Sequence, residues 1–192
     1  GMIDLIASSN RFMPHLHIPL QSGSGRILKK MKRRYNIDTY INKINSIKNQ
    51  IQDCTIGVDI MTGFPGETEQ DFSDTYDLLS QLPISYLHVF PFSERENTAA
   101  YSMKNKVSLD VRYARAKILR KLSNIKFQEI QRRNINQVRS VLFEVNENDF
   151  ISGLTDNYIR VKVPNSESKT NFISDVKLLS VDNEVMLGEI VQ

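Results

Sequence analysis

Hydrophobic and polar positions along the chain change repeatedly between the spacing of strands and that of helices. Apolar runs predict strands at residues 15–20, 55–64 and 85–92. Between them, isoleucines recur at helical spacing from Ile41 to Ile51 after Asp38, a capping residue, and residues 68–82 predict a helix with acid in its first turn. Strands that alternate with helices are typical of an α/β domain with a parallel sheet. The strand "TIGVDIMTGF" is apolar enough to be buried on both faces.

The pattern changes near residue 134. Residues 108–134 predict one long helix capped by Ser108, and after it five short strands divided by polar turns predict a small antiparallel barrel. We therefore expect two domains, residues 2–135 and 136–192. Three parallel strands make an incomplete domain, because such sheets normally have both faces and edges covered, so we expect the first domain to be the second half of a barrel.

Composition narrows the classes of protein to consider. The 192 residues are 40% hydrophobic and 24% charged, which is typical of a soluble globular protein. No apolar run reaches the roughly 18 to 20 residues of a membrane helix, so we expect a cytoplasmic protein without a membrane partner. Cys54 is the only cysteine, which excludes an internal disulfide and any metal centre built from several thiolates.

The net charge of +3 is unevenly distributed. Residues 1–103 hold 10 Lys/Arg against 11 Asp/Glu, residues 104–139 hold 11 against 2, and residues 140–192 hold 4 against 9. A basic segment of this kind is either a solvated helix face or a surface for a polyanion.

The segment "DIMTGFPGETEQDF", residues 59–72, passes from a strand through a glycine turn into a helix. A phosphate-binding loop of the P-loop kind needs a lysine after its last glycine, where this chain has Glu67, and "GSGRIL" lacks the third glycine of a dinucleotide fingerprint. A phosphate-loop enzyme is therefore the weakest reading. A tight turn shaped by Pro65 and Gly66 explains these residues alone, but not the motifs around them.

Four segments, in order, resemble the radical S-adenosylmethionine methylthiotransferases of tRNA: "HLHIPLQSGSGRILKKMKRRY", "GVDIMTGFPGETEQDF", "LHVFPFSERENTAA" and "GLTDNYIRV". The elements "LHVFPFS" and "TDNYIRV" point to the subgroup that installs a 2-methylthio group on threonylcarbamoyladenosine near the anticodon. The resemblance covers nearly the whole chain. It implies the later strands of a radical-SAM partial TIM-like barrel, followed by a TRAM/OB-like β-barrel that binds tRNA. Asn97 departs from the glycine common in the family, which affects only local loop shape.

The resemblance implies S-adenosylmethionine and [4Fe-4S] clusters in the intact enzyme, held partly by a C-x-x-x-C-x-x-C motif and three further cysteines. With Cys54 alone, we expect none of these groups bound to this chain, no catalytic residue, no protein-bound metal and no radical chemistry. Gly1 before Met2 resembles a scar of tag removal, and whether the missing half reflects an engineered cut stays open. The alternative is a non-catalytic RNA-binding module from a shortened gene.

Cofactor sites in parallel barrels lie at the carboxyl ends of the strands. There the resemblance implies contacts to S-adenosylmethionine: close approach at a bare glycine, hydrogen bonds to its ribose or methionine part, and aromatic rings beside adenine. The residues are Gln21, Ser22, Thr62, Gly63, Phe90, Phe92 and Ser93. For RNA, basic residues of the long helix and a strand that combines stacking with charge suggest Arg112, Arg115, Arg120, Tyr158, Arg160 and Lys162.

A few polar residues remain. Asp59 in an apolar strand should have a partner, because an unpaired buried carboxylate is costly. Glu67 is expected to favour the helix N-terminus. His15, His17 and His88 form a conceivable metal site, although interior histidines with ordinary partners fit better. Exposed sheet edges make self-association an expectation.

Overall fold

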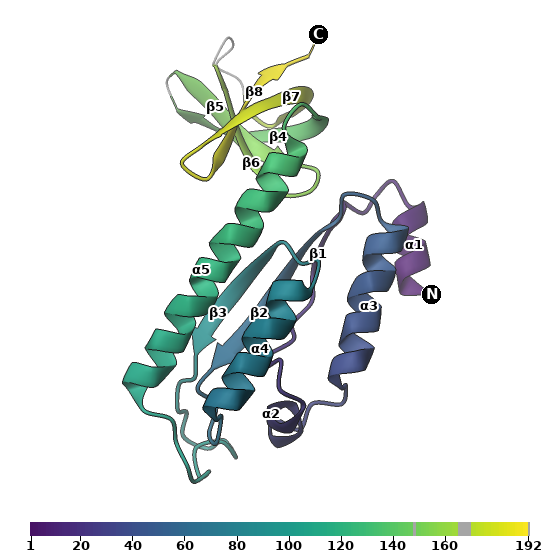
Figure 1. The fold of residues 1–192 in the computed structure, drawn as a ribbon. Coiled ribbons are helices and arrows are strands. Elements are labelled where there is room, and N and C mark those ends of the chain that lie inside the picture. The colour runs from purple at the N-terminus through teal and green to yellow at the C-terminus, as the bar shows by residue number, and fades with distance from the viewer. Residues whose placement is uncertain (148, 165–169, 192) are drawn as a thin grey trace. The chain divides into compact units, whose positions relative to one another are not determined.

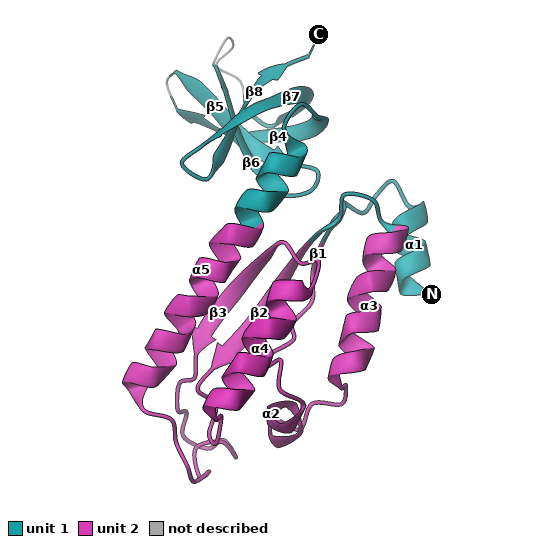
Figure 2. Cartoon of the chain, in the orientation of Figure 1, with its two compact units in different colours: residues 1–15, 51–55, 127–192 teal, residues 16–50, 56–126 magenta. Residues whose placement is uncertain are grey.

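A computed structural model of the chain describes residues 1–147, 149–164 and 170–191. The chain forms two compact units, one of residues 16–50 and 56–126, the other of residues 1–15, 51–55 and 127–192 (Figure 2). The first holds most of a parallel sheet, and the second holds a closed barrel. The boundary between the two domains expected from the sequence, at residue 136, stays a prediction.

The parallel sheet has three strands in the order β1-β2-β3: β1 (His15–His17), β2 (Thr55–Thr62) and β3 (Tyr86–Pro91) (Figure 1). Strands β2 and β3 are parallel, with Gly57 opposite Tyr86 and Met61 opposite Phe90. After β1, Gln21 forms a parallel bridge with Ile60. The predicted parallel sheet is confirmed.

The helices of the chain are α1 (Met2–Ser8), α2 (Gly25–Lys30), α3 (Ile37–Gln50), α4 (Glu69–Gln81) and α5 (Leu109–Asn134). Thr68 caps α4, since its hydroxyl accepts from the Asp71 amide while the Asp71 carboxylate accepts from the Thr68 amide. The cap of α3 is Asn36 and not Asp38 as expected, because Asn36 Oδ1 accepts from the Thr39 amide at 2.8 Å. No helix among the described residues is long and apolar enough to cross a membrane.

The two faces of the sheet differ in burial, although β2 meets the prediction of burial on both faces over its first half, where Thr55 and Gly57 are buried as well. Ile56, Val58 and Ile60 of β2 are fully buried, whereas Asp59 and Met61 are half-buried. In β3, Leu87 and Val89 are buried, while the alternate residues are half-buried or exposed. Helix α5 is tied to β3 by Ser123, whose hydroxyl bonds both the amide and the carbonyl of Leu87.

The barrel closes in the order β4-β5-β6-β8-β7. Its strands are β4 (Val138–Glu147), β5 (Phe150–Thr155), β6 (Arg160–Pro164), β7 (Phe172–Asp182) and β8 (Val185–Ile190). Four pairings are antiparallel, but β6 and β8 pair in parallel, so the expected purely antiparallel barrel is wrong at that seam. Phe143, Val161 and Leu178 are among the fully buried side chains of its core.

Candidate functional site

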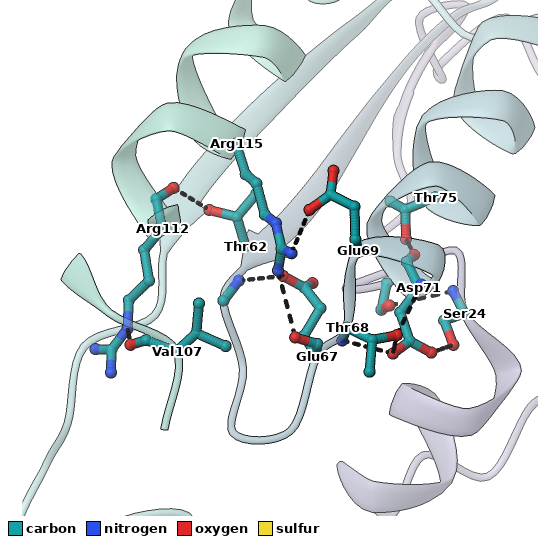
Figure 3. A network of polar contacts seen from close by, with 12 residues as sticks. Ser24, Thr62, Glu67, Thr68, Glu69, Asp71, Thr75, Val107, Arg112 and Arg115 are labelled. Carbon is teal, nitrogen blue, oxygen red and sulfur yellow. Dashed lines mark hydrogen bonds and ion pairs between the residues drawn. The ribbon is translucent and has the colours of Figure 1, made fainter. Parts of the chain in front are cut away.

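The glycine turn after β2 is stabilised by hydrogen bonds between residues of the protein itself. The Gly63 amide donates to the Glu67 carboxylate at 2.7 Å, and Arg115 Nη1 donates to the same oxygen at 2.7 Å (Figure 3). Gly63 has a φ of +75°, and a Cβ on it would lie 2.2 Å from Cγ of Arg112. Arg112 thus fills the space that a side chain at Gly63 would take, and the contact of the Gly63 backbone with a cofactor stays a prediction.

Glu67 and Arg115 form a buried ion pair that also reaches the first turn of α4. Arg115 Nη2 donates to Glu69 at 2.8 Å. Burial raises the pKa of Glu67, although hydrogen bonds from Gly63 and Arg115 act in the opposite direction. For Arg115, burial opposes the charge, but the two glutamates outweigh it and raise its pKa. Glu67 therefore anchors a turn and a basic side chain, and its expected effect at the helix N-terminus stays a prediction.

Arg112 is 3% exposed and holds together three segments around the carboxyl end of β3. Its guanidinium donates to the carbonyls of Val107 at 2.8 Å and Phe92 at 2.9 Å, and to Glu94 at 2.8 Å. The hydrogen bonds from Arg112 and Lys106 lower the pKa of Glu94. Arg112 and the 6%-exposed Arg115 are therefore interior residues, and their burial contradicts the expectation that they contact RNA.

A second polar cluster joins the loop before α2 to the start of α4. The Asp71 carboxylate accepts from Ser24 Oγ at 2.6 Å, from Arg26 Nε at 3.1 Å and from the Thr68 amide at 2.7 Å. Burial opposes ionisation of Asp71, but the hydrogen bonds from Arg26, Ser24 and Thr68 outweigh it and lower its pKa well below the usual range. The cluster fixes the loop that follows β1.

The predicted cofactor residues differ in what they can offer a ligand. Ser22 is buried and accepts from the Ser24 amide, and Thr62 is buried and donates to the Arg112 carbonyl at 3.0 Å. Phe92 is buried, with its ring edge-on to Phe64, and its contact with adenine stays a prediction. The residues with accessible surface are half-buried Gln21, exposed Phe90 and exposed Ser93.

Two cavities adjoin these loops. One of about 400 Å³ is lined by residues that include Phe92, Ser93, Arg112 and Arg120. The other, of about 240 Å³, has an apolar lining of Met31, Met61, Phe64, Phe92 and Met103 beside basic side chains. The structure therefore brings part of the predicted set to the carboxyl ends of the strands, where small-molecule sites of α/β folds lie.

The less buried face of the sheet carries polar and aromatic residues that the predicted cofactor set left out. His17 Nε2 lies 2.8 Å from the Asp59 carboxylate, so the predicted partner of Asp59 exists. The His88 ring lies 5.2 Å from the His17 ring and 5.2 Å from the Tyr86 ring, and Phe90 follows two positions later on β3. The polar and apolar alternation of "YLHVFP" was the signal for this face. Such a surface can stack a flat ring and offer it a carboxylate.

His15 has different neighbours from the other two histidines. Its Nδ1 lies 2.9 Å from Thr55 Oγ1, and its ring stacks on Tyr158 with centroids 4.2 Å apart. Within the described residues, no group of three His, Cys, Asp or Glu side chains is arranged for a metal ion.

The remaining predicted RNA contacts lie in both units. Arg120 is exposed and donates to the Val89 carbonyl at 3.2 Å. Tyr158 is 50% exposed, with one ring face covered by His15. Lys162 pairs with Glu147, and Arg160 is exposed. These placements leave the RNA contacts of Arg120, Tyr158, Arg160 and Lys162 as predictions.

Comparison with known proteins gives consistent family relationships. The model of the radical SAM superfamily matches residues 1–79. Threonylcarbamoyladenosine tRNA methylthiotransferase MtaB of Bacillus subtilis is 33% identical over 100% of this chain and 44% of its own length, and that of Aquifex aeolicus is 39% identical over 84% and 38%. A tRNA-2-methylthio-N(6)-dimethylallyladenosine synthase of Clostridium tetani is 35% identical over 98% and 42%. The chain thus spans less than half the length of these relatives.

A solved structure supports the same fold. Coproporphyrinogen III oxidase (HemN) of Escherichia coli, described as a radical SAM enzyme, superposes with a TM-score of 0.53 over 80% of this chain and 44% of its own, at 12% identity. At that identity the likeness shows the fold alone. The parallel sheet followed by a closed small barrel confirms the predicted fold class. Residues 1–79 match the superfamily model, and the relatives align along the whole chain. The chain therefore belongs to the family of radical S-adenosylmethionine tRNA methylthiotransferases.

Proposed function

We propose that the chain is part of an enzyme that installs a 2-methylthio group on threonylcarbamoyladenosine of tRNA. The observation that carries this proposal is the similarity of the whole chain to relatives named for that activity. Relatives named for the dimethylallyladenosine substrate have similar identity, so identity alone does not separate the two substrates. The elements "LHVFPFS" and "TDNYIRV" favour threonylcarbamoyladenosine.

The intact enzyme would use S-adenosylmethionine and [4Fe-4S] clusters, which supply the methyl group and the radical. A cluster does not fit the thiolates of this chain, because a cluster takes three or four and Cys54 is single and buried. For S-adenosylmethionine, Gln21, Phe90 and Ser93 keep surface at the carboxyl ends of the strands. We propose that these residues contact it, and that the turn held by Glu67 and Arg115 keeps their loops in place.

The single cysteine also favours a second candidate, a non-catalytic RNA-binding module. In both readings tRNA is the partner, and in both the cytoplasm is the expected compartment. The two candidates differ in what the reading frame of this chain encodes. For the enzyme it also encodes the cluster cysteines, and for the RNA-binding module it does not.

The test is genetic and chemical. The complete reading frame that encodes this chain would be deleted in its own organism, and the nucleosides of total tRNA would be measured by mass spectrometry. We expect loss of 2-methylthio-threonylcarbamoyladenosine, with its return on complementation. Loss of the 2-methylthio form of dimethylallyladenosine instead would mean that dimethylallyladenosine is the substrate. An unchanged nucleoside profile would favour the RNA-binding module.

A further inference from the structure

A cavity of about 560 Å³ lies between the end of α5 and the turn that joins β7 to β8, within the unit that contains the barrel. This volume is typical of small-ligand sites, which measure about 300–1,000 Å³. Its lining includes Gln131, Arg132 and Ile135 on the helix side, and Val181, Asn183 and Glu184 on the hairpin side. The site is distinct from the loops at the carboxyl ends of the parallel strands.

Gln131, one of the residues that line this cavity, holds an unused hydrogen-bond acceptor. The residue is 0% exposed, and its Nε2 donates to the Glu184 carbonyl at 2.6 Å. That bond fixes which end of the amide is the donor, because a carbonyl can only accept. The other end, Gln131 Oε1, is buried and has no hydrogen-bond partner among the residues that the structure describes. Buried acceptors are normally satisfied, so this one calls for an N–H or O–H donor.

The hairpin turn opposite Gln131 depends on the same hydrogen bond, from Gln131 to the Glu184 carbonyl. Asn183 and Glu184 have φ values of 45° and 70°, the left-handed pair of a two-residue hairpin turn. Glycine usually takes the second position, so a glutamate there is strained and needs support. The hydrogen bond from Gln131 to the Glu184 carbonyl provides that support, and it holds the turn over the cavity.

We propose that this cavity binds an unpaired base of tRNA, which rests on the proposed function for the identity of the RNA. Gln131 Oε1 accepts an amine or ring N–H of the base, and the apolar side chains of Ile135 and Val181 contact its flat face. Arg132, exposed at the edge of the cavity, supplies a cation for the neighbouring phosphate. Unpaired bases are recognised in this way, by hydrogen bonds to the base edge together with contacts to the ring.

Three proteins test the proposal: the wild type, Gln131→Met and Gln137→Met. Methionine keeps the length of the side chain and removes the acceptor. Gln137 is the matched control, since it is half-buried outside the cavity and donates to the Arg133 carbonyl. Affinity for an unmodified tRNA transcript would be titrated at two salt concentrations. We expect Gln131→Met to bind about tenfold more weakly with an unchanged salt slope, because no charge is lost, and Gln137→Met to bind like the wild type.

A second measurement separates a binding role from a folding role. In an NMR titration with the same transcript, the amides of Asn183 and Glu184 in the wild type should shift on binding. Equal affinity of Gln131→Met and wild type, or no shift at these amides, would overturn the inference. So would capture of a protein at the cavity in place of tRNA. The proposed function is decided separately, by the tRNA nucleosides of the deletion strain. Loss of the modification in that strain, beside equal tRNA affinity of Gln131→Met and wild type, would reject this inference alone.

Discussion

At the scale of single residues, Gly63 shows how the turn after β2 depends on one side chain. Its φ of +75° is unfavourable for other residues, and a Cβ would lie 2.2 Å from a buried arginine held by several hydrogen bonds. We expect Gly63→Ala to lower the free energy of unfolding by about 2–3 kcal/mol, from the strain of the left-handed backbone and the displaced side chain together. Urea unfolding would measure it.

Gly25→Ala is the matched control for that substitution. Gly25 begins α2, has nothing within 4 Å of the added Cβ, and lacks a left-handed φ. Alanine there should change stability by less than about 1 kcal/mol, and in the favourable direction if at all. Equal destabilisation by both alanines would contradict the role assigned to Gly63.

Asp71 gives a prediction about acid stability. Its pKa is lowered in the folded chain, so its ionised form stabilises the fold above its ordinary pKa of about 4, and this stability is lost as the pH falls toward the lowered value. Asp71→Asn should therefore lower the free energy of unfolding by about 1–3 kcal/mol at pH 6. The gap to wild type should narrow below about pH 4. Exposed Asp74, on the same helix, is the control, and a gap independent of pH would show that packing rather than charge is responsible.

At the scale of elements, the end of α4 depends on a lysine from another helix. Lys126 Nζ donates to the carbonyls of Ser80 at 3.0 Å and Leu82 at 2.9 Å, where a helix leaves carbonyls without partners. We expect Lys126→Met to lower stability by about 1–2 kcal/mol and to speed amide hydrogen exchange in the last turn of α4. Exposed Lys121 on the same helix provides the control variant Lys121→Met. Unchanged exchange in Lys126→Met would remove the capping role.

Elements of the fold could be predicted from the sequence because the hydrophobic spacing of strands and helices is local. The helix predicted at residues 68–82 differs from the observed one by one residue at each end, since acid in its first turn marks where it begins. The burial of Arg112 and Arg115 could not be predicted, because their partners Glu94 and Glu67 are distant in sequence and a basic run looks the same whether it is paired or solvated. The alternation of polar and apolar residues in "YLHVFP" indicated the less buried face of β3. The apolar sequence of β2 gave no such indication.

At the scale of the whole molecule, the concentration of basic charge in residues 104–139 still needs an explanation. Part of it is internal, since Arg112 and Arg115 are paired with carboxylates. Reversing their charge would place a buried carboxylate at each position and leave buried Glu67 without its partner, which would disrupt the fold, so lost tRNA binding in such variants would carry no information about RNA contact. The informative residues are exposed ones on α5, among them Lys117, Arg120 and Lys121.

We therefore predict that Lys117→Glu with Lys121→Glu weakens tRNA binding while the chain stays folded. If both lysines contact phosphates, the slope of log affinity against log salt should become shallower by about 1–2, because fewer counterions are released on binding. The control is Lys43→Glu with Lys177→Glu, which changes the net charge equally at exposed positions on α3 and β7. Equal weakening in both double variants would mean that tRNA responds to the overall charge, and unchanged binding in the first would show that this face of α5 is only solvated. Only a loss confined to Lys117 and Lys121 would make α5 a tRNA contact, and the buried arginines would then serve to hold that helix against the loops at the carboxyl ends of the strands.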